Sequence, residues 1–464
     1  MKKLRRTITA LLAACMLSTS VFGMTVNAGA ATSASDSAAE VRPVVTAKTK
    51  PNQLIFSWTK VPGAKKYRVF EYYDGKYYKL ADTKNRQFFM SGVVPGNKYS
   101  VAVRAYVDGK WTKLSKKDIC TVRAEAVDAN EMLSLWNDSA ETKKQLVSYI
   151  KSVTKQGSKD YIPVEDRIAV FDFDGTLFCE TDPNYFDYTL LAYRVLEDPD
   201  YKDKASDFEK EVANKIKEQN ETGKSFEGLE TDHGKAVASA FRGMTLAEFN
   251  DYIQEFKKQP MLSYEGMLRG DGFYEPMIQI LNYLAANYFT TYIISGTDRF
   301  IVRGIFDDSR LYCPNRCIIG SDELTVATGQ DGEDGLTYQF THSDELVLGG
   351  EFIIKNLKMN KVSVIAQEIG EQPVLSFGNS TGDTSMANYT ITNNKYKSLA
   401  FMLCCDDTER ENGNIDKANK MYDLCDENGW IPVSMKNDWK TIYGEGVTYT
   451  GAYAASKAAN KAAA

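Results

Sequence analysis

Short apolar and aromatic segments alternate with polar turns in the first part of the chain. Each segment is rich in aromatic and β-branched residues, and glycine- or proline-containing turns lie between them, a pattern typical of β-strands. The pattern predicts a small all-β, immunoglobulin-like sandwich over residues 41–125. The predicted strand segments are 54–58, 66–72, 86–89, 98–106 and 111–122.

A different pattern follows the sandwich. Three continuous apolar runs of strand length are typical of strands buried on both faces of a parallel sheet, and amphipathic helical segments lie between them. The pattern predicts an α/β domain over residues 131–448, and Asp138 with Glu141 predicts, as a capping box, the helix that leads into it. The apolar runs are 168–171, 292–294 and 373–377.

A long insertion separates the first two apolar runs. It is far longer than one helical crossover requires, and much of it has helical periodicity. Thr245 and Glu248 form a capping-box pattern, followed by apolar residues on one helix face. The sequence therefore predicts a helical insertion over about residues 182–270.

The N-terminus has the pattern of an export signal. Basic residues precede an apolar run over about residues 8–26, and small residues follow it. We expect residues 1–30 to be a signal peptide, residues 31–40 to be a polar tether, and the protein to be secreted or attached to the cell surface. The sequence around Cys15 also resembles a lipobox, so a lipid anchor there is an alternative, and an uncleaved anchor is a third. Residues 451–464, rich in Ala and Lys, are predicted to be a frayed tail.

Composition and charge exclude several classes of function. The 464 residues are 43% hydrophobic and 25% charged, which is typical of a globular protein of several domains. With only His233 and His342, the chain is a poor fit to a Ser-His-Asp hydrolase, a His-ligated zinc site or a His-nucleophile phosphatase. A net charge of −6 and the lack of a dense basic stripe argue against a nucleic-acid partner. The few cysteines are expected to be thiols, although Cys313 and Cys317 could form a local bridge.

Two carboxylates directly follow the first apolar run. Asp172 and Asp174 are one residue apart, so alternation places both on one side of the chain at the carboxyl end of a buried strand. Open α/β sheets bind their ligands at that end. Because two close carboxylates repel each other unless a cation lies between them, the pair suggests a Mg²⁺ site.

Three later segments extend this pattern. Ser295 and Gly296 follow the second apolar run, Lys361 precedes an apolar helical stretch, and the loop 379–383 follows the third run. Each signal is weak alone, but their order behind Asp172 is hard to attribute to chance. The neighbouring lysines at 355 and 358 are alternatives to Lys361.

The first folded unit resembles a fibronectin type III domain. The resemblance rests on Trp58, on VPGAKKYRVF and on PGNKYSVAVRAY, with Trp58 as the core aromatic residue and Tyr99 as the tyrosine before an alternating strand. Such domains imply a spacer, or a contact to a cell-wall glycan or a protein. The nearby tyrosines are expected to pack across a hairpin, with sugar stacking as the alternative. These tyrosines are Tyr72, Tyr73, Tyr77 and Tyr78.

The second unit resembles the haloacid dehalogenase (HAD) superfamily of phosphohydrolases, in its phosphoserine-phosphatase-like branch. The resemblance spans residues 131–448 and rests on RIAVFDFDGTLFCE, YIISGTDRFIV, the lysine at 361 and VLSFGNSTGD. It implies a Rossmann-like core with a helical cap. It also implies that Asp172 attacks phosphorus, that Asp174 is the general acid and base, that Ser295 and the Gly296 amide bind the phosphoryl oxygens, and that Lys361 balances their charge.

The same resemblance implies a Mg²⁺ cofactor. Asp172, the main-chain carbonyl of Asp174 and the last loop would hold the ion. That loop departs from the common pattern, because its first position is Asn379 where the family often has Asp. A neutral amide binds a hard cation less well than a carboxylate does, so Asp383 would contribute more to binding the ion. Which of these two residues ligates the ion directly stays open. Glu180 could contact a ligand or a metal-bound water, or form a surface ion pair.

In the resembling family, the insertion is a cap that closes over the active site and selects the substrate. Four polar residues of this segment are expected to face solvent, with a contact to substrate as the alternative. They are Asp232, His233, Lys235 and Arg242.

The sequence therefore predicts an exported, Mg²⁺-dependent phosphomonoester hydrolase that acts on a small phosphorylated metabolite through an aspartyl-phosphate. One alternative is a phosphotransferase of the same fold. Another is a cell-surface binding or adhesion protein with a catalytically weak HAD-like domain, which Asn379 slightly favours.

Overall fold

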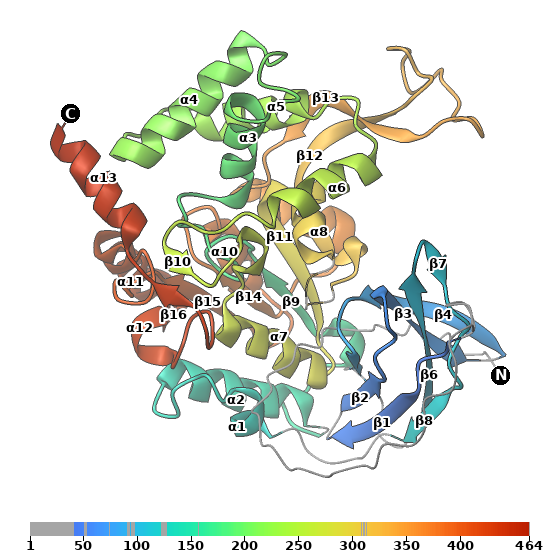
Figure 1. The fold of residues 1–464 in the computed structure, drawn as a ribbon. Coiled ribbons are helices and arrows are strands. Elements are labelled where there is room, and N and C mark those ends of the chain that lie inside the picture. The colour runs from blue at the N-terminus through green and yellow to red at the C-terminus, as the bar shows by residue number, and fades with distance from the viewer. Residues whose placement is uncertain are drawn as a thin grey trace. The chain divides into compact units, whose positions relative to one another are not determined.

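The computed structural model describes most of the chain after the predicted signal and tether. The predicted signal peptide, the tether and Cys15 lie outside the described residues. Two compact units are present (Figure 1), one running to Met132 with 281–288 and 308–313, and the other covering Leu133–Ile280, Phe289–Asp307 and Pro314 onward. The described residues are 41–463 except 51–52, 74, 91–92, 94–97, 122–127, 156, 308, 310 and 312.

The first unit contains a two-sheet β-sandwich. One sheet has the order β1-β2-β5, and the other has β4-β3-β6-β7 with β8 paired to β6. Two of these strands, β1 and β4, were not predicted, because both have few buried apolar residues. The strands are β1 Val45–Lys50, β2 Gln53–Trp58, β3 Ala64–Tyr73, β4 Lys76–Thr83, β5 Gln87–Met90, β6 Lys98–Val107, β7 Lys110–Trp111 and β8 Asp118–Thr121.

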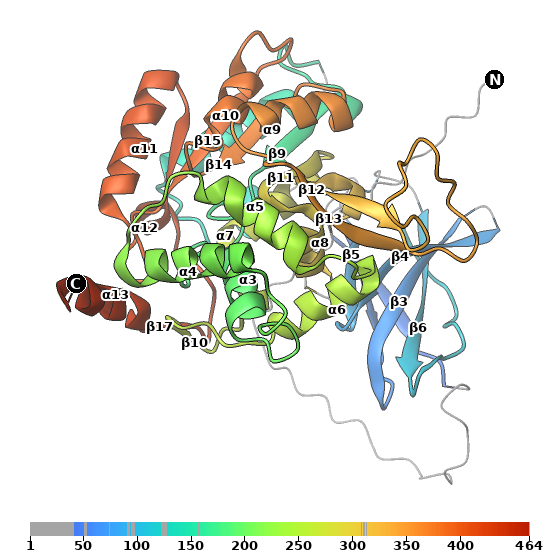
Figure 2. The same cartoon turned by 90° about the horizontal axis from the view of Figure 1, so that it is seen from above.

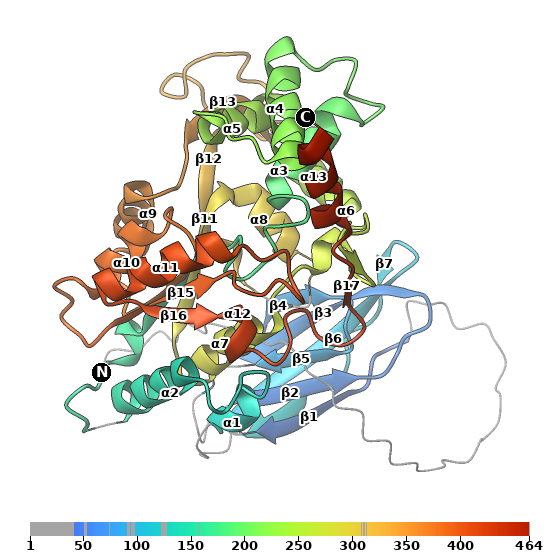
Figure 3. The same ribbon diagram turned by 90° about the vertical axis from the view of Figure 1, so that its left-hand side faces the viewer.

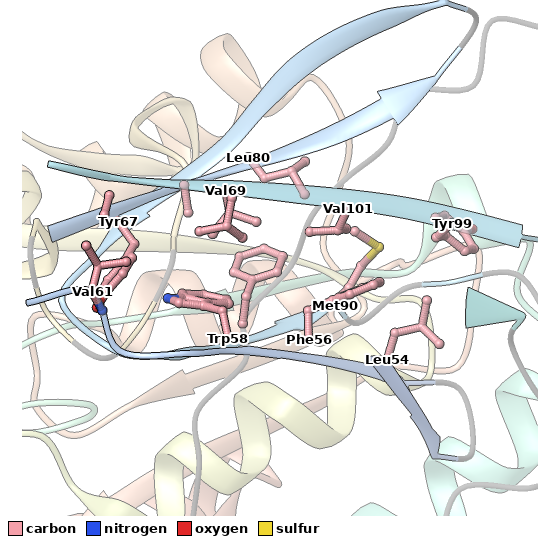
Figure 4. Close-up of a cluster of buried hydrophobic side chains, with 14 of the residues drawn as sticks. Leu54, Phe56, Trp58, Val61, Tyr67, Val69, Leu80, Met90, Tyr99 and Val101 are labelled. Atoms are coloured by element: carbon pink, nitrogen blue, oxygen red, sulfur yellow. The ribbon is translucent and has the colours of Figure 1, made fainter. Parts of the chain in front are cut away.

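Alternate residues of facing strands form the core of the sandwich (Figure 4). Leu54, Phe56 and Trp58 on β2 are all buried, as the period-2 pattern of a half-buried strand requires. The Trp58 ring lies 5.6 Å from that of Tyr67, and the Tyr67 hydroxyl accepts a hydrogen bond from the amide of Val61 at 3.1 Å. Trp58 is therefore a core residue, as predicted, and Tyr99 is buried as well.

The tyrosines of the β3–β4 hairpin pack across it. Tyr72 and Tyr77 are paired across the two strands, and their ring centroids are 4.9 Å apart. Tyr73, Tyr77 and Tyr78 are 46%, 44% and 48% exposed, so the hairpin also presents aromatic surface. The expected cross-strand packing is thus present for the first pair.

The second unit is built on a seven-stranded mixed sheet of order β13-β12-β11-β9-β14-β15-β16. Strands β11, β12, β9, β14, β15 and β16 run parallel to their neighbours, while β13 pairs antiparallel with β12. All four residues of β9 are buried, which explains its unbroken apolar sequence. The strands are β9 Ile168–Phe171, β11 Thr290–Asp298, β12 Ile318–Ala327, β13 Leu346–Ile354, β14 Leu375–Gly378, β15 Leu399–Cys404 and β16 Ile431–Ser434. The protein is therefore multidomain, with an all-β region and an α/β unit.

Helices surround this sheet, and four of them lie within the predicted insertion. Figure 3 shows α5 close to β13, and Figure 2 shows α9 beside α10. In the described part of the chain, no helix is both long and apolar enough to cross a membrane. The α-helices of the described chain, of which α1 belongs to the first unit, are α1 Ala129–Met132, α2 Glu141–Thr154, α3 Phe186–Leu196, α4 Asp207–Thr222, α5 Leu229–Ala240, α6 Leu246–Phe256, α7 Glu275–Ala286, α8 Arg299–Phe306, α9 Met359–Val364, α10 Thr384–Ile391, α11 Ile415–Asn428, α12 Met435–Asp438 and α13 Ala452–Ala463.

Of the two capping boxes predicted in this unit, one is present and one is not. The capping box of Thr245 and Glu248 is present at the start of α6. The one predicted from Asp138 and Glu141 is wrong: Ala140 precedes α2, and the Asp138 carboxylate instead accepts a hydrogen bond from Lys143 at 2.6 Å.

The C-terminal residues are ordered and contact the helical insertion. The predicted frayed tail is wrong, because its alanines form helix α13, and the Tyr453 hydroxyl donates to the carbonyl of Asn220 in α4 at 2.6 Å. A two-stranded pairing of β10 Tyr264–Glu265 with β17 Thr448–Tyr449 precedes this helix. Cys313 and Cys317 are both buried, and the local bridge between them is not formed.

Candidate active site

Three loops meet where the central strands of the mixed sheet end. Strand β9 lies between β11 and β14 and runs parallel to both, so their carboxyl ends share one edge. The amide of Asp172 donates to the carbonyl of Phe377 at 2.9 Å, which carries the pairing of β9 and β14 up to the first carboxylate. The topology therefore brings the Asp172, Ser295 and Asn379 loops together, although they are distant in sequence.

Lys361 joins two of these loops. Its ammonium lies 2.5 Å from Asp172 Oδ1 and 2.6 Å from Asp383 Oδ1, and its side chain is fully buried. The lysine comes from α9 and Asp383 immediately precedes α10, and these two helices lie side by side (Figure 2). Lys358 is exposed and Lys355 is half-buried, so Lys361 is the lysine that contacts Asp172.

The second carboxylate, Asp174, lies beside the end of β11. The Thr297 hydroxyl donates to Asp174 Oδ2 at 2.7 Å, and the Thr297 amide donates to the Ser295 hydroxyl oxygen at 3.0 Å. Ser295 is fully buried, and the carbonyl of Gly296 accepts a hydrogen bond from Ser321 at 2.6 Å. The Ser-Gly-Thr segment is thus held against Asp174.

The last loop is organised around Asp383. Its Oδ2 accepts hydrogen bonds from the amides of Asn379 and Ser380, at 3.1 Å and 3.0 Å, and from the Ser380 hydroxyl at 3.2 Å. Since Oδ1 contacts Lys361, both oxygens of Asp383 already have partners within the protein. The side-chain oxygen of Asn379, by contrast, is buried and has no hydrogen-bond partner.

These residues fit a Mg²⁺ ion. Asn379 Oδ1 is a buried oxygen without a partner, and it lies on the same edge as the carboxylates of Asp172 and Asp174. Within the described ranges no three His, Cys, Asp or Glu side chains are grouped as a metal site, so the fit depends on an amide and main-chain oxygens. Mg²⁺ suits such a site, because it is bound by one or two carboxylates and keeps several waters.

Gly175 makes the close approach of these loops possible. Its φ is +71°, and a Cβ there would lie 1.8 Å from Asn379 Nδ2 and 2.5 Å from Glu180 Cδ. A side chain here would displace the side chains of Asn379 and Glu180, and the positive φ would add strain. Glu180 is buried, and its carboxylate pairs with Lys417 at 3.5 Å, so it is not a surface residue.

Burial and neighbouring charges set the protonation of the site. Burial raises the pKa of Asp172 to about 7, with Asp383 adding to the shift and Lys361 opposing it. Burial, followed by the charges of Asp187 and Asp172, raises the pKa of Asp174. For Lys361, burial alone would lower the pKa, but the two carboxylates outweigh it and raise it. The arrangement combines a carboxylate that is paired with a cation and a second carboxyl group that tends to keep its proton.

A polar hollow of about 220 Å³ lies beside Glu180. Glu180, Lys417 and Tyr453 of α13 are among the residues that line it. Glu180 also lies against Gly175, but neither Asp172 nor Asp174 lines the hollow. Its remaining lining is mostly amide and hydroxyl side chains, including Asn184, Asn412 and Asn414.

The polar residues of the insertion are not all at the surface. Lys235 and Arg242 are exposed and Asp232 is half-buried. His233 departs from the expectation, because it is 1% exposed and stacks on Tyr188 with ring centroids 3.9 Å apart. Helix α5 turns this residue inward, whereas its neighbours on the outer side of the helix stay in solvent.

Two residues that lie at this site were not identified from the sequence. Thr297 was read as part of a motif, yet its hydroxyl contacts Asp174 directly. Asp187, near the start of α3, is 1% exposed and its charge acts on Asp174. Thr297 could have been found from its position two residues beyond Ser295. The place of Asp187 depends on how the insertion packs, so no local pattern shows it.

Comparisons with known proteins concern the β-sandwich. The structure FN3tt is 23% identical over 18% of this chain and 95% of its own, with a TM-score of 0.17. A Fn3-like protein from Clostridium thermocellum is 25% identical over 19% of this chain and 98% of its own, with a TM-score of 0.17. A fibronectin type III domain of the human KIAA0970 protein is 19% identical and covers 20% of this chain and 77% of its own, with a TM-score of 0.17.

The N-terminal all-β region is therefore similar to fibronectin type III domains. No protein-family model matches the chain, and no curated protein does.

Proposed function

We propose that the second unit is a HAD-type, Mg²⁺-dependent phosphomonoester hydrolase with a Rossmann-like core and a helical cap over about residues 182–270. The observation that carries this proposal is the buried contact of Lys361 with both Asp172 and Asp383. Burying three charged groups costs several kcal/mol per ion in general, so proteins keep such clusters chiefly where they are used. The proposed substrate is a small phosphorylated metabolite.

In the proposed reaction, a carboxylate oxygen of Asp172 attacks phosphorus and the bond from phosphorus to the ester oxygen breaks. Asp174 gives its proton to the leaving alkoxide and then takes a proton from the water that hydrolyses the aspartyl-phosphate. Thr297 holds Asp174 by a 2.7 Å hydrogen bond, so the proton donor has one orientation. Lys361, Ser295 and the Gly296 amide would balance the charge of the phosphoryl oxygens.

Asp172, the main-chain carbonyl of Asp174 and Asn379 are the proposed ligands of Mg²⁺. When bound, the ion would offset the negative charge shared by the carboxylate and the phosphoryl group. Asn379 is the better candidate in the last loop, because its side-chain oxygen has no partner whereas both oxygens of Asp383 do. Asp383 is then a positioning residue, which fixes the loop and Lys361.

The helical insertion would control access to the site. Asp172 and Asp174 are 6% and 7% exposed, which supports an insertion that would move to admit a substrate. Closure would exclude water during phosphoryl transfer and open again for release. We further propose that the protein is exported, on the pattern of residues 1–30.

Trapping the intermediate tests this proposal. The protein would be mixed with a phosphomonoester and Mg²⁺, quenched in acid and digested, and the peptide that holds Asp172 weighed. Phosphorylation of that peptide is expected in the wild type and not in Asp172→Asn. Transfer of the group to added alcohols in preference to water would favour a phosphotransferase of the same fold, and a peptide that is never phosphorylated would count against both.

A further inference from the structure

The β-sandwich carries a charge opposite to that of the rest of the chain. Residues 41–125 contain 18 Lys and Arg against 6 Asp and Glu, whereas residues 126–464 contain 34 against 54. The net charge of −6 therefore combines a basic sandwich with an acidic remainder. A strong charge of one sign on a small domain indicates a partner of the opposite sign.

Part of this positive charge lies on the outer face of one sheet of the sandwich. Along β3 and β6 the core residues alternate with residues that point away from the core. We call this outer side the cationic face. Its cations are Lys66 and Arg68 of β3, Lys79 of β4, Arg104 of β6 and Lys117, which precedes β8.

Aromatic rings hold these cations in place. Arg68 lies over the Trp111 ring at 4.4 Å from its centroid, and Arg104 lies over the same ring at 4.9 Å. The Lys117 ammonium lies 3.3 Å from the centroid of the Tyr72 ring. Such contacts orient the charged groups before a ligand arrives, so less side-chain entropy is lost on binding.

The charge of Arg104 is not neutralised by the described residues. Arg104 is directly opposite Arg68 on the paired strands. Asp82 accepts two hydrogen bonds from Arg68, at 2.6 Å and 2.7 Å, and also pairs with Lys79 at 3.1 Å. In the described part of the chain no carboxylate forms an ion pair with Arg104, and its buried Nε atom has no hydrogen-bond partner. Since like charges directly opposite each other are destabilising, an anion bound here would relieve the repulsion.

The cationic face suits an extended polymer better than a single small anion. Lys66 and Tyr72 are six residues apart on β3, which corresponds to about 20 Å along the strand. Lys66 therefore lies near one end of the face and Lys117, over Tyr72, near the other, with Arg68 and Arg104 between them. A chain with repeated negative charges could contact several of these cations at once.

Partly exposed aromatic rings favour sugar units in that polymer. Tyr77 is 44% exposed and is paired with Tyr72 across the hairpin, and Tyr106 and Trp111 are half-buried on the same face. Flat aromatic rings with a polar edge offer an apolar surface against which the C–H groups of a sugar ring can pack. The proposed export of the protein also favours a polysaccharide outside the cell over a nucleic acid.

We propose that the cationic face binds an anionic polysaccharide and so attaches the protein to a polymer outside the cell. Arg104 and Lys117 would contact negative groups of the polymer, while Tyr77 and Tyr106 would pack against its sugar rings. The inference goes beyond the proposed function and does not depend on it, because every residue of this face belongs to the first unit.

The test compares the binding of the purified protein to three immobilised polymers by surface plasmon resonance. Polygalacturonate has a carboxylate on each sugar ring, dextran has sugar rings without charge, and poly-glutamate has carboxylates without sugar. We expect binding to polygalacturonate that weakens as NaCl is added, because salt screens exposed charges. Dextran should not bind, and poly-glutamate should bind at least about threefold more weakly than polygalacturonate, because it lacks the stacking surface.

A double variant, Arg104→Gln with Lys117→Gln, removes two cations of the face. We expect it to bind polygalacturonate at least about tenfold more weakly, since two charge-assisted hydrogen bonds are lost. Lys48→Gln with Arg86→Gln is the matched control, because it removes one Lys and one Arg, both exposed, from the other sheet. This control should stay within about twofold of the wild type, since distant charges are screened.

Circular dichroism would show that the variants are folded. Lys117 is exposed, so Lys117→Gln alone, with a smaller loss in the same direction, replaces the double variant if that one does not fold. No binding of polygalacturonate, or equal weakening in the two double variants, would overturn the inference.

Other occupants of the face would give different results, each of which would also overturn the inference. Equal or tighter binding to poly-glutamate, to DNA or to phosphatidylglycerol vesicles would identify an acidic protein, a nucleic acid or a membrane as the partner. Salt-sensitive self-association that Arg104→Gln with Lys117→Gln abolishes, without binding of polygalacturonate, would identify a second copy of the acidic unit.

Discussion

The ammonium of Lys361 lies 2.5 Å from Asp172 Oδ1 and 2.6 Å from Asp383 Oδ1, with all three side chains buried. One cation therefore faces two carboxylates in a region from which water is excluded. The pairing fixes two loops that are far apart in sequence, and it stabilises Asp172 in its ionised form. Both the stability of the α/β unit and its activity should therefore depend on the contact of Lys361 with the two carboxylates.

Replacing Lys361 tests that dependence. Lys361→Met would leave two buried carboxylates without their partner, and we expect a loss of about 3–5 kcal/mol in the free energy of unfolding of the α/β unit. Phosphate release should also be lost. Lys358→Met is the control, because Lys358 is exposed and three residues away. Chemical unfolding followed by circular dichroism measures the effect, and equal stability of the two variants would contradict the account.

Two glycine variants distinguish the effect of crowding at Gly175 from the effect of its backbone conformation. Gly175→Ala and Gly332→Ala both place a side chain at positive φ, which costs about 1 kcal/mol. Only the first forces a Cβ to within 1.8 Å of Asn379, whereas nothing lies within 4 Å of the second. We expect Gly175→Ala to raise the Mg²⁺ concentration for half-maximal activity by about tenfold or more, as displaced supporting groups do in other metal sites.

The Gly332 variant should keep the Mg²⁺ requirement of the wild type. If the two variants respond alike, the crowding against Asn379 has no role in metal binding.

Thr297 is a positioning residue for Asp174. Thr297→Val removes the hydroxyl that donates to Asp174 at 2.7 Å while keeping the volume of the side chain. We expect kcat to fall by about tenfold or more with little change in KM, because the proton donor loses its orientation and substrate binding is not involved. Thr297→Ser should restore most of kcat. A loss confined to KM, or no rescue by serine, would show that the hydroxyl has another role.

His233 gives a pH dependence with a defined sign. Burial lowers its pKa in the folded protein to about 4 from an ordinary value of 6.5, so the unfolded chain binds a proton that the folded protein does not. Stability should therefore fall as the pH drops from about 6.5 to 4, by about 3 kcal/mol in total from this residue. His233→Gln should lack this component, and thermal unfolding from pH 7.5 to pH 4.5 measures it. Parallel curves for the two proteins would contradict the burial of a neutral His233.

The sequence predicted the candidate site residues best where they directly follow a buried strand. Asp172, Ser295 and Asn379 each follow a buried apolar run, and parallel strands bring such positions to one edge of a sheet. Lys361 was placed by its order in the chain, and the structure puts it against Asp172. The sandwich was also foreseen from its alternating strands, and similar solved structures exist for it.

What escaped prediction depends on tertiary packing. Nothing local marks Asp187 or His233 as buried, since both are polar residues, and only the packing of the insertion turns them inward. Strands β12, β13, β15 and β16 were not predicted, and β13 gains its place in the sheet through antiparallel pairing with β12. Tail helix α13 is anchored by the contact of Tyr453 with Asn220, which no local pattern shows.

The central claim is metal-dependent hydrolysis through Asp172. The direct measurement is phosphate release by the purified protein from a panel of small phosphomonoesters, with Mg²⁺ or with EDTA, beside Asp172→Asn and the exposed control Asp203→Asn. The account predicts turnover that EDTA abolishes, that Asp172→Asn lacks and that Asp203→Asn retains. A folded, Mg²⁺-loaded protein that releases no phosphate from any ester, or an Asp172→Asn variant with wild-type turnover, would contradict it.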